Sequence, residues 1–190
     1  MVRSAFEQAF PETCREDLEQ VLQILPTATV DNISILVSVA GITYNLSDYF
    51  VQFPYRIYLE EPKEERIQAL SDTQKLILAC IYTRSHDGYI RQKYVKEILD
   101  VDFPAWCIPY IVKLCDEYVA EILEVIYDGL KDRDNGEVQE FCRNNRERTR
   151  KGYARMTSYW NEYYRGTKFH KYIGRKLYRQ CLGYTKSFEK

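Results

Sequence analysis

Apolar residues recur at helical spacing along most of the chain, and this periodicity is its main structural signal. Positions three and four apart predict helices over residues 14–25, 71–83, 89–99, 137–145 and 147–165. Ser71, with Gln74 three residues later, has the pattern of a capping box and marks the start of the second helix. The clearest apolar face runs over 108–127, where we expect one central buried helix.

Residues 32–60 change to a period of two, which is typical of strands. Apolar residues alternate from Ile33 to Val39 and from Ile42 to Leu46, and a third strand-like run extends from Tyr55 to Leu59. A lone hairpin is only marginally stable, so these strands must pack on helices. The predicted fold class is mostly α (α+β): a helical bundle or stacked helical hairpins, with a small antiparallel β-hairpin or three-strand element near 33–59.

Length and composition bound the class of protein. A chain of 190 residues, 45% hydrophobic and 29% charged, is typical of one globular domain. No run approaches the eighteen apolar residues of a membrane span, and the N-terminus lacks the pattern of a secretory signal. The six cysteines form no C-x-x-C pair, so we expect reduced, mostly buried thiols. These features favour a cytoplasmic protein with no membrane partner.

The net charge of −1 hides a strong asymmetry along the chain. Residues 141–190 hold fourteen Lys/Arg and three Asp/Glu, a net of +11, which leaves a net of −12 for residues 1–140. We therefore expect an acidic helical core over 1–136, which includes the β element, and a basic, aromatic-rich helical segment over 137–190. The second part should pack on the first to make one domain.

Four acidic residues of the predicted central helix follow spacings of four, three and four. Glu117, Glu121, Glu124 and Asp128 would form an acidic stripe opposite the apolar face of that helix. Like charges at this spacing repel by a few tenths of a kcal/mol per pair, so a cation nearby should offset them. We expect the basic segment of the same chain, or of a second copy, to lie against this stripe.

Our first functional hypothesis is a non-enzymatic interaction module that binds another protein or associates with itself. Trp106, beside Phe103 and Pro104, could serve as an exposed aromatic anchor. The alternative for Trp106 is burial under the start of the following helix.

The second hypothesis is nucleic-acid binding through 141–179. The interleaved aromatic residues would stack on bases, but they also fall at core spacing, and the isoelectric point of about 6.2 is low for a dedicated nucleic-acid binder. Residues 71–99 also have a helix-turn-helix outline, but any tight pair of antiparallel helices gives this pattern, and a plain helical hairpin is the favoured interpretation. The candidate phosphate contacts are Arg148, Lys151, Arg155, Arg165, Lys168, Lys171, Arg175, Lys176 and Arg179.

An enzyme is the third and least favoured hypothesis. The chain has two histidines, His86 and His170, and contains no phosphate-binding glycine loop or nucleophile motif. The sequence therefore suggests no catalytic residue, no metal ligand and no cofactor.

Overall fold

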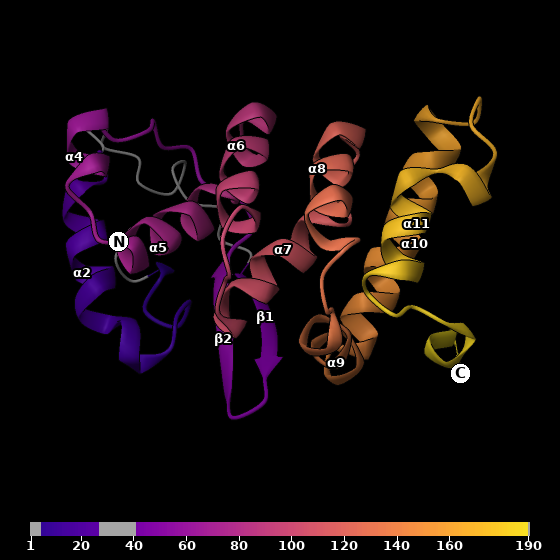
Figure 1. The fold of residues 1–190 in the computed structure, drawn as a ribbon, viewed down its shortest axis with the longest axis horizontal. Helices are drawn as coiled ribbons and strands as arrows, with labels where there is room; N and C mark the ends of the chain where they lie inside the picture. The colour runs from indigo at the N-terminus through magenta and orange to yellow at the C-terminus, as the bar shows by residue number, and fades with distance from the viewer. Residues whose placement is uncertain (1–4, 27–40, 190) are drawn as a thin grey trace.

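Helices make up most of residues 5–26 and 41–189, the parts of the chain that the computed structural model describes (Figure 1). The predicted class, mostly α with a small antiparallel β element, is confirmed. Within the described residues no helix combines the length and the apolar character needed to cross a membrane.

The longer helices pack one after another in the order α2, α5, α6, α8 and α11, and α10 packs on α11. Figure 1 shows α6 and α8 upright and side by side, with α7 between their lower ends and α11 on the far side of α8. This succession has the character of stacked helical hairpins. The helices are α2 (Arg15–Ile24), α4 (Glu64–Gln68), α5 (Asp72–Tyr82), α6 (Gly88–Leu99), α7 (Ile108–Leu114), α8 (Ala120–Leu130), α9 (Gly136–Asn144), α10 (Arg146–Tyr163) and α11 (Ile173–Gln180).

Local signals place α5 and α6 where the sequence predicts them. The Ser71 hydroxyl accepts the Gln74 amide, and the Gln74 side chain accepts the Ser71 amide, so the predicted capping box is confirmed. Asp87 caps α6 by accepting the backbone N–H of Tyr89 at 2.8 Å. The tight connection over 83–87, between the end of α5 and the cap of α6, turns α6 back against α5.

The β element is one hairpin of β1 (Gly41–Leu46) and β2 (Tyr49–Pro54), and it pairs Ile42 with Phe53. Its buried face packs on the helical core. The Asn145 side chain, between α9 and α10, accepts the Asn45 N–H and donates to the Asn45 carbonyl, each at 2.7 Å. This pair of bonds joins β1 to the C-terminal half of the chain.

Of the other predicted strands, the run from Ile33 to Val39 lies outside the described residues. The prediction of a strand over Tyr55–Leu59 is wrong, because Ile57 makes only a single parallel bridge, with Ser85. Pro54 ends β2 and has no N–H to extend the ladder. The segment that follows turns instead toward the connection between α5 and α6.

The predicted single helix over 108–127 is also wrong, because the chain leaves the helix between α7 and α8. Pro109 lies in the first turn of α7, where the missing N–H costs nothing, so it does not kink the helix. Residues 115–119 form a non-helical link. The Tyr164 hydroxyl donates to the Tyr118 carbonyl at 2.8 Å and accepts the Ala120 N–H at 3.3 Å, which satisfies backbone groups at the break.

The break changes the predicted acidic stripe. Glu117 lies in the link and is buried, whereas Glu121, Glu124 and Asp128 are exposed on α8. Asp128 pairs with Lys131 of its own segment at 2.7 Å. In the described part of the chain, no ion pair connects residues 137–190 with any of the four stripe positions, so the expected pairing within one chain is not formed, and pairing with a second copy stays a prediction. Glu117 binds Arg56 and Arg91 instead. The basic segment reaches the link through Arg155, which pairs with Asp116.

A short 3-10 helix, η3, covers Phe169–Lys171 and precedes α11. A further short helix, η4, covers Lys186–Glu189. The six cysteines are free thiols, and all six are buried as expected.

Candidate functional site: an arginine cluster beneath a tyrosine surface

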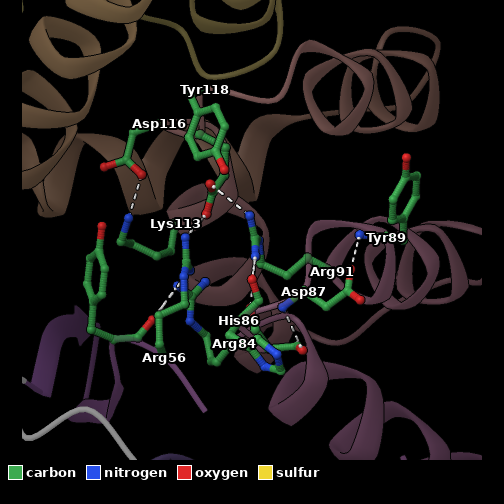
Figure 2. Close-up of polar contacts among 12 residues, drawn as sticks. Arg56, Arg84, His86, Asp87, Tyr89, Arg91, Lys113, Asp116 and Tyr118 are labelled. Atoms are coloured by element: carbon green, nitrogen blue, oxygen red, sulfur yellow. Dashed lines mark hydrogen bonds and ion pairs between the residues drawn. The ribbon is translucent and has the colours of Figure 1, made fainter. Parts of the chain in front are cut away.

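Backbone pairing between two distant segments brings the first members of the site together. The Ile57 N–H donates to the Arg84 carbonyl at 2.8 Å, and the His86 N–H donates to the Ile57 carbonyl at 2.9 Å. Residues 55–57 therefore lie along the connection between α5 and α6. As a result the Arg56 and Arg84 side chains enter the same region of the core (Figure 2).

Glu117 is the first of two carboxylates in this region, and only 3% of its side chain is exposed. Arg56 donates to one of its oxygens at 2.6 Å, and Arg91 of α6 donates to the other at 3.3 Å. Burial alone would raise the pKa of Glu117, but Arg56 and Arg91 hold that pKa below its ordinary value. Glu117 is therefore a charged carboxylate clamped between two guanidinium groups.

Asp116 is the second carboxylate, and it binds cations from two other elements. Lys113 of α7 donates to one oxygen of Asp116, and Arg155 of α10 donates to the other at 2.7 Å. Burial lowers the pKa of Lys113, although Asp116 acts in the opposite direction. The link between α7 and α8 thus holds α6 through Glu117 and α10 through Asp116.

Arg84 is fully buried, yet its guanidinium group is only partly satisfied. Its Nη2 donates to the Tyr55 carbonyl at 2.9 Å. Its Nε and Nη1 have no hydrogen-bond partner among the described residues, and neither has the Nε of Arg91. Burial, with the nearby Arg56, lowers the pKa of Arg84 to about 10. Buried arginines with unpaired donors are unusual, since unmet donors cost about 1–3 kcal/mol.

The cluster carries an excess of positive charge. Five cations surround two carboxylates, which is a net of three positive charges; four of the cations share the two carboxylates, and Arg84 pairs with neither. We call this set the arginine cluster: Arg56, Arg84, Arg91, Lys113, Arg155, Asp116 and Glu117. Burying an unpaired charge costs several kcal/mol, and Arg84 is fully buried, so an anion beside it would stabilise the fold.

The arginine cluster reaches solvent beside a group of tyrosines. The side chains of Arg56 and Arg155 are 15% and 42% exposed. The Tyr118 and Tyr163 rings are 50% and 62% exposed as whole residues, and their centroids lie 6.3 Å apart. Tyr118 also contacts Tyr159 at 5.9 Å. We call this region the tyrosine surface: Tyr55, Tyr118, Tyr159 and Tyr163, with Arg56 and Arg155 at its base.

Tyr55 connects the surface to the buried charges. Arg56 lies 5.0 Å from the centroid of its ring and Lys113 lies 5.1 Å from the same centroid. Cations at these distances are attracted to the ring face, by about 0.5–2 kcal/mol each depending on solvent exposure. The ring therefore helps to hold both cations at the base of the surface.

Of the nine predicted phosphate contacts, only Arg155 belongs to the arginine cluster. Several of the others make local contacts: Lys151 pairs with Glu147 at 2.6 Å, and Arg179 donates to the Tyr184 carbonyl at 3.0 Å. Arg148 and Arg175 lie over the rings of Tyr44 and Phe169, and Arg165, just after α10, bonds Asn161 of that helix. Lys168 and Lys171 are exposed, and Lys176 is partly exposed.

Most aromatic rings of 141–179 pack on one another. Tyr153 stacks on Tyr184 with centroids 4.1 Å apart, and Trp160 lies 4.7 Å from Phe169. Trp106, the predicted anchor, is partly buried and meets the Phe10 ring edge-on at 5.6 Å. Its partner ring thus lies within the fold.

Sequence reasoning missed four basic members of the arginine cluster and Asp116. The available signal was the position of Lys113, Asp116 and Glu117 inside the longest apolar pattern of the chain. Charged residues are almost never fully buried unless they are paired, so such residues predict partners elsewhere in the fold.

Comparisons with protein-family models, with curated proteins and with solved structures gave no match for this chain. In the part of the chain that the structure describes, no three His, Cys, Asp or Glu side chains are grouped so that they could hold a metal ion.

Proposed function

We propose that the chain is a non-enzymatic protein-binding module that holds an acidic segment of a partner protein on the tyrosine surface. The observation that carries this proposal is the pair of exposed rings, Tyr118 and Tyr163, above a cluster with three excess positive charges. Tyrosine and arginine are among the residues most enriched at the centres of protein interfaces. The charge excess favours an acidic segment over a neutral or basic one.

Nucleic acid fits this surface less well. Bases would need several free rings along a basic groove, and most rings of 141–179 already pack on each other. A cytoplasmic location belongs to the same proposal, and the six free cysteines support it because disulfides are rare in that compartment.

Photocrosslinking tests the proposal. A benzophenone amino acid replaces Tyr163 in cells that make the chain, and the matched control carries it at Phe50, an exposed ring of the hairpin. We expect position 163 to crosslink a protein with an acidic segment and position 50 not to do so. An adduct with nucleic acid, an adduct with a second copy of the chain, or equal labelling at both positions would each contradict the proposal.

The crosslinked segment is then synthesised and titrated against the purified full chain. We expect Tyr118→Ala to weaken its binding by about ten- to thirty-fold, as truncation of an interface anchor does. Tyr89→Ala removes an exposed ring outside the tyrosine surface and should leave the affinity unchanged. An equal effect of both substitutions would show that the segment binds elsewhere.

A further inference from the structure

Two buried arginines of the cluster have hydrogen-bonding capacity that the described residues leave unused. Arg84 has no exposed surface and Arg91 is almost fully buried, and three of their nitrogen donors are unpaired: Nε and Nη1 of Arg84, and Nε of Arg91. Water satisfies such donors on a surface but is scarce in a core. The unpaired donors and the excess positive charge around them define a place where the buried arginines lack a counterion.

We propose that the arginine cluster is a binding site for one oxyanion of the phosphate class. A phosphate carries a charge of about −1.5 to −2 near neutral pH and three acceptor oxygens. It would offset more of the three excess charges than a carboxylate, which brings one. Guanidinium groups bind phosphate in short, charge-assisted hydrogen bonds.

Arg56 is the way into this site. It lies near Arg84, and its side chain is partly exposed while Arg84 is not. Its guanidinium group already binds Glu117 at 2.6 Å, so an entering oxyanion would share Arg56 with that carboxylate. To reach Arg84, the oxyanion would have to displace the Arg56 side chain from its present position.

The source of the oxyanion rests on the proposed function. If a partner protein lies on the tyrosine surface, the group that enters beside Arg56 is a phosphorylated side chain of that partner. Tyr55 and Tyr118 would then flank the residue that carries the phosphate. Free phosphate offers the same chemistry, so the two sources need separate measurements.

Calorimetric titration of the full chain with inorganic phosphate tests the site, with chloride at matched ionic strength as the reference. We expect saturable binding of phosphate. Arg84→Gln should weaken that binding by about ten- to a hundred-fold, as expected for loss of charge-assisted hydrogen bonds. Arg165→Gln, at an exposed position just after α10 where the arginine bonds Asn161, should bind like the unchanged chain.

If Arg84→Gln does not fold, Arg56→Gln replaces it, because that side chain lies at the rim of the core. Absence of saturable phosphate binding, or unchanged affinity in the Arg84 or Arg56 variant, would overturn the site. A blocked phosphoserine that binds at least as tightly as inorganic phosphate would support a phosphorylated partner. Binding of inorganic phosphate alone would support the oxyanion site and overturn the phosphorylated partner.

These outcomes are independent of the crosslinking result. Phosphate binding without a protein adduct at Tyr163 would remove the proposed function and leave the oxyanion site. A protein adduct without phosphate binding would leave the proposed function and remove the oxyanion site.

Discussion

Replacing Glu117 by Gln should destabilise the chain strongly although the side chain keeps its shape. The change removes the negative charge that lies 2.6 Å from Arg56 and 3.3 Å from Arg91. With an effective dielectric constant of about 20, these contacts correspond to about 6 and about 5 kcal/mol of attraction. Desolvation of the three buried groups offsets several kcal/mol per ion. We therefore expect a net loss of about 3–5 kcal/mol, as for other broken buried pairs.

The effect should also depend on pH with a definite sign. The pKa of Glu117 is lowered in the folded state, while the unfolded chain should have the ordinary value of about 4.3. A depressed pKa contributes stability that is present above the unfolded value and is lost as pH falls through the folded value. The unchanged chain should therefore lose more stability than Glu117→Gln on acidification below about pH 4.3.

Urea unfolding at pH 7 and at a series of acidic pH values measures both effects. Glu121→Gln is the matched control, because Glu121 is exposed on α8 and should change stability by less than about 0.5 kcal/mol. A loss below about 1 kcal/mol for Glu117→Gln, or identical acid dependence in the two chains, would refute the argument that Glu117 is a charged and essential partner of the arginines.

Three further predictions concern the fold. Ser71→Ala removes the hydroxyl of the capping box and should cost about 1 kcal/mol in urea unfolding; no change would mean that α5 does not need this cap. Gly129→Ala places a Cβ 2.9 Å from the Leu99 Cβ and should cost about 1–3 kcal/mol by forcing α6 and α8 apart, whereas a neutral result would contradict their close approach. All six buried thiols should react with an aromatic disulfide reagent only on unfolding, and rapid reaction of the native chain would contradict their burial.

Local signals explain which elements were predictable. The cap at Ser71 and the apolar spacing behind it define α5 within a few residues, so no distant partner is needed to find it. The alternation from Ile42 to Leu46 likewise identifies β1, because its buried side chains face one way. Where sequence neighbours decide the structure, periodicity and capping suffice.

The break between α7 and α8 has no comparable local signal. Apolar spacing continues through Tyr118 and Val119, so the pattern favours an unbroken helix. The link forms where Glu117 binds Arg56, sixty-one positions away, and Asp116 binds Arg155, thirty-nine positions away. Helix propensity is a weak preference that tertiary contacts of this strength override. The candidate site was missed for the same reason as the break.

The charge of the site differs from the charge of the segments that build it. Four of its five cations, Arg56, Arg84, Arg91 and Lys113, come from the part of the chain with a net charge of −12. The strongly basic segment contributes only Arg155. Net charge by segment therefore points toward 141–179, while the folded arrangement concentrates uncompensated positive charge at the link between α7 and α8. Because interactions between charges fall off with distance and are screened by solvent, the local excess should decide where an anionic partner binds.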